Sequence, residues 1–343
     1  MTADDPPERV VVAVDGGGSK TDAVAVGLDG AVRAFARGGP SNAQGVGLAR
    51  AVGTLSDVVG SVLDEAASSA GRRVEVARVG LFVAGLDFDR EKDRMRRALA
   101  ERAWSRGVPL RVENDMLALL RTGTDAPDAV AVVCGTGINC LGVRGDGATV
   151  RFPALGSLSG DWGGGGDVGM AALWSAARAA DGRGEPTELV EAIPRAFGRP
   201  DLAAVIEALH FGDLAESRVA ELSPLVFRCA RRGDTVAGRI VDALGDEIAL
   251  MSGVALDRLG LADRETPVVV GGGVASSGDD RLMRRIRSGL SGRAPLARLV
   301  VTRERPIIGA ALQALADDGA TEATLRRARR ELTEAAGAAD ASD

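Results

Sequence analysis

The chain has 343 residues, of which 45% are hydrophobic and 26% are charged, and its formal net charge is −6. This composition is typical of a globular protein without a basic surface for nucleic acid, and the length suits two domains better than one core. No stretch approaches the ~20 consecutive apolar residues of a membrane span, and the acidic N-terminus lacks a signal-peptide layout, so we expect a cytoplasmic protein with no membrane partner.

The first third of the chain alternates short apolar strands with longer helices. The continuous apolar run over 10–14 is typical of a strand buried on both faces, and a glycine turn follows it. Asp29-Gly30 is a hairpin-turn signal. In chain order we expect strands over 10–14, 23–27 and 31–37, a helix over 48–70, a strand over 79–83, a helix over 90–104 and a strand over 110–113.

The next part begins with the same pattern. An apolar run over 129–133 leads into the glycine turn Gly135-Thr136-Gly137, and Asp146-Gly147 is again a hairpin-turn signal. The two copies start roughly 120 residues apart, which implies duplicated domains facing one another. We further expect strands over 140–143, 148–152 and 268–270, helices over 169–180, 202–209, 214–232, 235–259 and 307–316, and an exposed charged helix with a frayed end from 321.

The segment D-G-G-G-S-K-T at 15–21 looks like a phosphate-binding loop but fits neither common nucleotide motif. A Walker A loop needs glycine directly before the lysine, where Ser19 stands, and a Rossmann loop needs glycine at the position of Thr21. Both motifs open a helix, whereas residues 23–26 have the pattern of a strand. The remaining interpretation is a β-hairpin whose turn presents backbone N–H groups after an acidic residue, Asp15.

Several chemistries are constrained by what the sequence lacks. His210 is the single histidine and lies at an expected helix end, so a His-rich metal site is excluded and a Ser-His-Asp triad has no good candidate. The three cysteines, Cys134, Cys140 and Cys229, show neither metal-type pairing nor a disulfide framework.

A series of motifs continues along the chain after D-G-G-G-S-K-T. They are G-P-S-N (39–42), V-E-N-D (112–115), C-G-T-G-I-N-C (134–140), G-D-W-G (160–163), V-V-V-G-G-G-V (268–274) and P-I-I-G-A-A (306–311). In this order they resemble the N-acetylglucosamine kinase and BadF/BadG/BcrA/BcrD ATPase family of the actin/Hsp70/sugar-kinase superfamily. The likeness extends from about residue 10 to 317.

The resemblance implies an α/β fold of two duplicated actin-like (ribonuclease H-like) lobes with a cleft between them. The expected domains are residues 1–120 with a C-terminal helix from about 305–320, residues 121–304, and a charged tail over 321–343. The resemblance also implies ATP and Mg²⁺ as cofactors, a small-molecule sugar as substrate and a homodimer.

By the same resemblance, the two hairpin turns grip the triphosphate from opposite sides and the third glycine cluster holds the adenosine. Asp15 is expected to orient water bound to Mg²⁺. Lys20 either contacts a phosphate or points to solvent, and Thr136 either offers its hydroxyl to a phosphate or is an ordinary turn residue. The candidate nucleotide-binding residues are Gly16, Gly17, Gly18, Ser19, Lys20, Thr21, Gly135, Thr136, Gly137, Gly271, Gly272 and Gly273.

Asp115 is the candidate catalytic base, because a carboxylate at the end of a strand can accept the proton of an attacking hydroxyl. The alternative is an N-cap for the helix that starts at Met116. By themselves Asn42 and Asn139 are also compatible with ordinary turn and loop hydrogen bonding. The candidate substrate-binding residues are Asn42, Asn114, Asp115, Asn139, Gly156 and Asp161.

Two positions depart from the family pattern at the sugar. Trp162 stands where the family motif Gly-Asp-Glu-Gly has Glu, and Leu155 stands where animal-type N-acetylglucosamine kinases have a Trp that stacks on the sugar. Trp162 either compensates from a nearby position or belongs to the core, and Asp167 has the position of a first-turn helix acid.

The predicted function is ATP-dependent phosphorylation of an amino sugar, with N-acetylglucosamine at its 6-hydroxyl as the first candidate. One alternative is a BadF/BadG-type ATPase that activates another enzyme through an iron–sulfur cluster, which the scattered cysteines disfavour. Another is a non-catalytic sugar-sensing protein of the same fold, which the presence of Asp115 and the lack of a DNA-binding extension disfavour.

Overall fold

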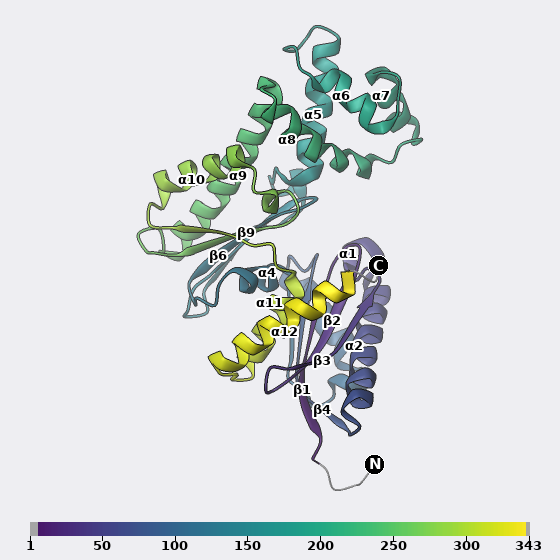
Figure 1. Cartoon of the computed structure of the whole chain (residues 1–343), viewed down its shortest axis with the longest axis vertical. Helices are drawn as coiled ribbons and strands as arrows, with labels where there is room; N and C mark the ends of the chain where they lie inside the picture. The colour runs from purple at the N-terminus through teal and green to yellow at the C-terminus, as the bar shows by residue number, and fades with distance from the viewer. Residues whose placement is uncertain (1–5, 341–343) are drawn as a thin grey trace. The chain divides into compact units, whose positions relative to one another are not determined.

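The computed structural model describes residues 6–340 (Figure 1). The chain forms two compact units, one made of the residues up to Asp125 together with those from Glu304 onward, and one made of Ala126–Arg303. The C-terminal segment therefore returns to the unit in which the chain begins.

The first unit is built on a five-stranded sheet with the order β3-β2-β1-β4-β5. The pairs β1–β2 and β2–β3 are antiparallel, and the pairs β1–β4 and β4–β5 are parallel. The strands are β1 (Glu8–Gly16), β2 (Thr21–Gly27), β3 (Val32–Gly38), β4 (Val74–Val83) and β5 (Leu110–Glu113). The glycine turn after Asp15 thus ends the central strand of this sheet.

Both faces of β1 are covered. Val10, Val12 and Val14 join a core cluster with α2 (Leu48–Ala70), while α11 (Pro306–Asp317) packs on β1 from the opposite face together with α4 (Met116–Gly123) (Figure 1). Because successive strand side chains point to opposite faces, the uninterrupted apolar run supplies both cores. The unit also contains α1 (Ala43–Val46), α3 (Asp89–Ala100), η1 (Ala103–Ser105) and α12 (Glu322–Asp340).

The second unit repeats this sheet. Its order is β10-β9-β6-β7-β8, with antiparallel pairs β6–β7 and β7–β8 and parallel pairs β6–β9 and β9–β10. The strands are β6 (Ala129–Cys134), β7 (Ile138–Val143), β8 (Thr149–Arg151), β9 (Pro267–Gly271) and β10 (Arg298–Val301). The predicted internal repeat is confirmed, since both sheets have the same strand order and directions.

Helices supply most of the second unit's core. The long helix α9 (Thr235–Leu259) packs on the sheet and on α10 (Asp280–Arg293). Its buried residues, which include Leu244, Ile248 and Leu256, lie in one cluster with β6 and β9. The other helical segments are η2 (Gly156–Leu158), α5 (Gly164–Ala180), α6 (Leu189–Phe197), α7 (Leu202–Phe211), η3 (Glu216–Leu222), α8 (Ser223–Arg231) and η4 (Ala275–Ser277).

Several element boundaries differ from the prediction. Helix α5 begins at Gly164 rather than at 169, because its first turn is glycine and is held by contacts from outside the helix. The helix expected over 214–232 divides into η3 and α8 at Ser223, since Pro224 occupies the first turn of α8, where no amide donor is needed. The helix expected over 90–104 ends at Ala100. Helices α1, α6 and α10 and strand β10 were not predicted.

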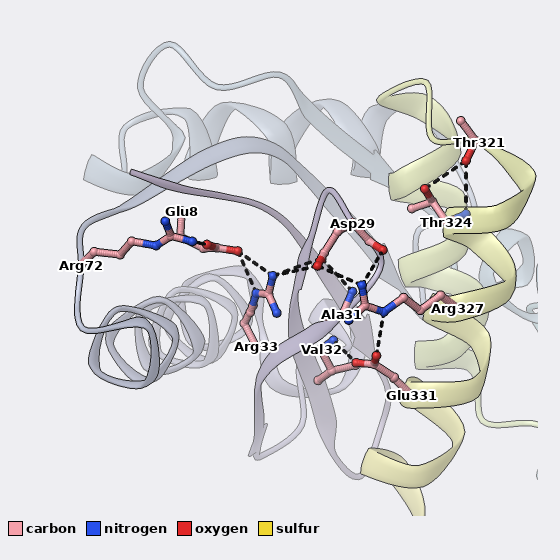
Figure 2. A network of polar contacts seen from close by, with 10 residues as sticks. All are labelled: Glu8, Asp29, Ala31, Val32, Arg33, Arg72, Thr321, Thr324, Arg327 and Glu331. Atoms are coloured by element: carbon pink, nitrogen blue, oxygen red, sulfur yellow. Dashed lines mark hydrogen bonds and ion pairs between the residues drawn. The ribbon is translucent and has the colours of Figure 1, made fainter. Parts of the chain in front are cut away.

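The C-terminal helix α12 packs on the first unit, so the expectation of an exposed helix is wrong. Ala328, Leu332 and Ala336, spaced four residues apart, are buried. Figure 2 shows the polar side of this contact, in which Arg327 binds Asp29 of the β2–β3 turn at 3.0 Å and Glu331 accepts a hydrogen bond from the Val32 amide at 2.8 Å. The predicted frayed end falls partly on residues 341–343, outside the described residues.

Asp29 links this contact to the start of β1. Arg33 binds Asp29 at 3.1 Å and Glu8 at 2.8 Å, and Arg72 binds Glu8 (Figure 2). The paired charges anchor the C-terminal helix to the turn of the N-terminal hairpin. Across residues 6–340, no helix has both the length and the apolar content to cross a membrane.

Candidate functional site

The first glycine turn joins β1 to β2 and is held by its own backbone. The Gly17 amide donates to the Lys20 carbonyl at 2.8 Å, and the Gly17 carbonyl accepts from the Ser41 and Asn42 amides. A Cβ on Gly16 would lie 2.3 Å from Ser41 Oγ, so packing requires glycine there. Residues 18–20 form the exposed tip of the turn.

The side chain of Thr21 does not face this tip. It is fully buried, and its hydroxyl donates to the Gly39 carbonyl at 2.7 Å and lies 2.8 Å from Ser41 Oγ. Thr21 was one of the candidate nucleotide-binding residues, but its hydroxyl is not available to a phosphate, because it fastens the hairpin to the segment after β3.

Asp15 lies beside two other carboxylates. Burial, then the charges of Asp115 and Asp22, raise the pKa of Asp15 from 3.8 to about 8, against smaller lowering effects of Arg305 and Lys20. Asp22 is itself paired with Arg37 at 2.7 Å and with Arg305. The end of β1 therefore favours either a proton or a cation next to Asp15.

These surroundings fit a cation that contacts the protein indirectly. Across the described part of the chain, no three His, Cys, Asp or Glu side chains are grouped to hold a metal ion. Mg²⁺ usually keeps several waters and binds one or two carboxylates plus phosphate oxygens. Asp15, with Asp115 nearby, is the donor set that suits such a hydrated ion.

Asn114 and Asp115, which follow β5, differ in whether their side chains cap helix α4. The Met116 amide donates to Asn114 Oδ1 at 3.0 Å, and the side chain of Asp115 makes no capping hydrogen bond to α4. The capping alternative for Asp115 is therefore wrong. Asn114 is buried and fills that role, while Asp115 keeps part of its surface in solvent.

Two residues missed in the sequence connect the predicted sugar contacts of this unit. Asp87 accepts hydrogen bonds from Asn114 Nδ2 at 3.3 Å and from Gln44 Nε2 at 3.1 Å. The backbone N–H of Gln44 donates a hydrogen bond to Asn42 Oδ1 at 2.9 Å. The structure thus brings Asn42 and Asn114 into one polar network, at the edge of a cavity of about 250 Å³ lined in part by Gln44 and Gly85. The segment A-G-L-D at 84–87 directly follows strand β4, and an acidic residue so close to the end of a strand was the signal available in the sequence.

The second glycine turn joins β6 to β7. The Gly135 amide donates to the Gly137 carbonyl at 3.0 Å, and Thr136 and Gly137 are exposed. The Thr136 hydroxyl has no hydrogen-bond partner within residues 6–340, which leaves the predicted phosphate contact open. Asn139 is buried, and its Oδ1 accepts a hydrogen bond from the Cys140 amide at 2.7 Å, so loop hydrogen bonding already uses part of this side chain.

The third glycine cluster follows β9. Gly271 ends the buried strand, Gly272 has φ +92° with its backbone against Cys134, and Gly273 is exposed. The Val274 amide donates to the Cys134 carbonyl at 3.0 Å. The second and third predicted turns are therefore in direct contact within this unit.

The glycines at these turns are of two kinds. A Cβ on Gly16, Gly164 or Gly272 would collide with protein atoms, whereas a Cβ on Gly18, Gly135, Gly137 or Gly273 would meet nothing within 4 Å. The second kind has neither a left-handed φ nor a neighbour that explains the missing side chain. Such space suits a ligand that approaches the backbone closely.

We expect Gly135→Ala to weaken nucleotide binding at least tenfold while leaving the melting temperature nearly unchanged, because the added methyl group meets only the space left for a ligand. Titration with Mg·ADP and thermal unfolding test this. Gly292→Ala, on α10 with nothing near its Cβ, is the matched control. Wild-type ADP affinity in Gly135→Ala would remove this turn from the nucleotide site.

The predicted sugar loop of the second unit is stabilised by Asp161. Its carboxylate accepts hydrogen bonds from Ser159 Oγ at 2.7 Å and from the Gly156 amide at 3.2 Å. Trp162 packs against the core, which favours a core role over sugar stacking. Glu247 on α9, missed in the sequence, has its pKa raised by burial and by the charge of Asp161.

The cysteines lie in the core and not at a surface. Burial raises the pKa of Cys134 to about 12 and also raises the pKa of Cys140. All three thiols are buried, Cys229 on α8.

The model of the BadF/BadG/BcrA/BcrD ATPase family matches residues 12–314. The chain belongs to this family. It is 29% identical over 324 residues to an N-acetyl-D-glucosamine kinase of Dictyostelium discoideum, covering 90% of this chain and 98% of that protein. It is 25% identical over 269 residues to an N-acetylmuramic acid/N-acetylglucosamine kinase of Clostridium acetobutylicum, covering 78% and 86%.

The fold of this family member is likewise shared with a solved structure. A Chromobacterium violaceum protein, provisionally assigned as an N-acetylglucosamine kinase, superposes with a TM-score of 0.63 at 25% identity, covering 90% of this chain and 100% of that one. The predicted fold class, two duplicated actin-like α/β lobes, is confirmed. The relatives are sugar kinases, which are phosphotransferases with an alcohol acceptor.

Proposed function

We propose that this protein is an ATP-dependent sugar kinase that transfers a phosphoryl group to an amino sugar, with the 6-hydroxyl of N-acetylglucosamine as the first candidate acceptor. The observation that carries the proposal is that Asn114, and not Asp115, caps helix α4 at the end of β5. Asn114 caps α4, so the carboxylate of Asp115 is not committed to the helix. A carboxylate so placed can accept the proton of a sugar hydroxyl as that oxygen attacks phosphorus.

The glycine turns support nucleotide binding. The tips at residues 18–20 and 136–137 are exposed, and Gly18, Gly135, Gly137 and Gly273 leave room for atoms that are not part of the chain. We propose that these turns donate backbone N–H groups to phosphate oxygens and that Gly273 lies against the nucleoside. Asp15 would hold hydrated Mg²⁺, which when bound supplies neutralisation of phosphate charge.

Each unit, taken by itself, offers candidate contacts to a sugar. In the first unit, Asn42 and Asn114 belong to one network through Gln44 and Asp87, and Asp115 follows Asn114 in the chain. In the second unit, Asp161 orders the Gly156 loop. A sugar hydroxyl can both donate and accept a hydrogen bond. Carboxylate oxygens accept from such a hydroxyl, and side-chain amides can donate to it or accept from it. Leu155 in place of a stacking Trp removes one aromatic contact, so the choice among amino sugars depends on the polar groups.

A kinase assay coupled to ADP release tests the proposal over glucosamine, N-acetylglucosamine, N-acetylmannosamine, glucose and a muramic-type sugar. We expect release to be stimulated most by an N-acetylated amino sugar, because a bound acceptor completes the site and excludes water. Absence of stimulation by every sugar would favour the ATPase alternative, and iron analysis of anaerobically purified protein would then test its cluster-dependent form.

A further inference from the structure

The longest glycine run of the chain, Gly163–Gly166, opens helix α5 and is not used by the proposed chemistry. The first amides of a helix have no acceptor within the helix. Here they donate to the second glycine turn: Gly165 to the Gly135 carbonyl at 2.7 Å and Gly166 to the Thr136 carbonyl at 2.9 Å. The start of α5 therefore braces the turn and does not offer its amides to an anion.

The contact is so close that it requires glycine. Gly164 has φ +80°, and a Cβ there would lie 2.5 Å from the Gly137 carbonyl carbon and oxygen. A Cβ on Gly169, one turn further along α5, would lie 2.0 Å from the Val219 carbonyl oxygen. Backbone thus packs directly on backbone, and a shift of the first turn of α5 has to shift the glycine turn.

Asp167 closes this first turn. Its carboxylate accepts a hydrogen bond from the Gly163 amide at 2.8 Å. Gly163 lies two residues after Asp161, whose own carboxylate holds the Gly156 amide. The backbone of the Gly156–Asp161 loop therefore continues through Trp162 into this segment, in which Asp167 holds the Gly163 amide and the Gly165 and Gly166 amides hold the Gly135–Gly137 turn.

The glycine turn is held from its other side as well. The Val274 amide donates to the Cys134 carbonyl at 3.0 Å, and a Cβ on Gly272 would lie 2.5 Å from that same oxygen. Cys134, the last residue of β6, is thus fixed between the start of α5 and the third glycine cluster.

We propose that the segment Gly163–Asp167 transmits the state of the Gly156–Asp161 loop to the Gly135–Gly137 turn, with Asp167 as the positioning residue. The inference rests on the proposed function, in which the loop contacts sugar and the turn contacts nucleotide. Sugar bound at the loop orders the turn and raises nucleotide affinity. By reciprocity, nucleotide bound at the turn orders the loop and raises sugar affinity by the same factor, about 5- to 150-fold.

Hydrogen exchange of the whole protein with Mg·ADP as probe tests the link without any sugar. In the wild type, Mg·ADP is expected to slow amide exchange at 135–137, at 163–166 and in the loop 156–161. Asp167→Ala removes the acceptor for Gly163, so Mg·ADP should still slow 135–137 but no longer the loop. Asp167→Asn retains a side-chain oxygen acceptor and should behave as the wild type. Asp181→Ala, which removes an exposed acid paired with Arg183 just after α5, is the matched control.

A binding measurement supplies the second arm. The ratio of Mg·ADP affinities with and without N-acetylglucosamine is expected to fall to about one in Asp167→Ala and to stay at the wild-type value in the Asn and control variants. Two results would overturn the link. One is an amide exchange rate in the loop that Mg·ADP does not change in the wild type. The other is an equal slowing of loop exchange by Mg·ADP in Asp167→Ala and in the wild type. Because the exchange arm needs no acceptor, the link is tested even if no sugar stimulates ADP release, and that result would contradict the proposed function alone.

Discussion

Replacing Asp115 with Asn is expected to lower turnover by about 10²- to 10⁴-fold while changing the affinities for Mg·ATP and sugar little. The amide keeps the size of the side chain but cannot accept the hydroxyl proton. The α4 cap is unaffected, since Asn114 provides it. Steady-state kinetics, with binding of both ligands measured separately, distinguish a loss in kcat from a loss in affinity.

Glu113→Gln is the matched control for this substitution. Glu113 ends the same strand, but its carboxylate pairs with Lys92 at 3.0 Å, so turnover should stay within a few fold of wild type. Turnover of Asp115→Asn close to that of the control would mean that another group takes the proton. Loss of sugar affinity with unchanged turnover would instead make Asp115 a binding residue.

The strands and turns could be predicted because local patterns determine them. The run Val10–Val14, the Asp-Gly turns and their recurrence near Ala129 identified two copies of one hairpin unit, and the structure has both. Elements without such a pattern were missed. Strand β10 has four residues, and its place beside β9 depends on contacts far apart in the sequence.

The site residues show the same limit. The positions of Asp15 and Asp115 follow from strands that end just before or at them, which is visible in the sequence. The inward orientation of Thr21 depends on Ser41 and Gly39, and the role of Asp87 depends on Gln44 and Asn114. The spacing of residues along the sequence does not predict such contacts, since they form only when the segments that follow β3, β4 and β5 come together in the fold.

The C-terminal helix illustrates a further cause of error. Its many charged residues suggested exposure, but Arg327 and Glu331 are used against the β2–β3 turn, and three alanine and leucine positions are buried beneath them. Charged residues along a helix predict solvent exposure only for the faces that pack against no other element.

Ligand-free wild-type protein is expected to lose stability relative to Asp15→Asn as pH rises from about 4 to about 8. The pKa of Asp15 is raised to about 8 in the folded state, against an ordinary value of 3.8. Between these values the unfolded chain has released a proton that the folded protein retains, so unfolding becomes easier as pH rises. The contribution is up to about 1.4 kcal/mol per pH unit and levels off above the folded pKa.

Urea unfolding in EDTA, in steps of about one pH unit, measures this difference between wild type and Asp15→Asn. Ser19→Ala, at the exposed tip of the same turn, should follow the wild type. Parallel pH profiles of wild type and Asp15→Asn would show that folding does not raise the pKa of the Asp15 carboxyl.

Mg·ADP connects this pH dependence to the proposed site. A divalent cation close to Asp15 favours the ionised carboxylate and lowers its pKa, so the stability of the wild type should vary less with pH when Mg·ADP is bound. In Asp15→Asn, Mg·ADP should raise stability by mass action without changing the slope. If the wild-type slope is the same with and without Mg·ADP, the metal does not lie near Asp15, and the cluster with Asp22 and Asp115 would then serve proton binding alone.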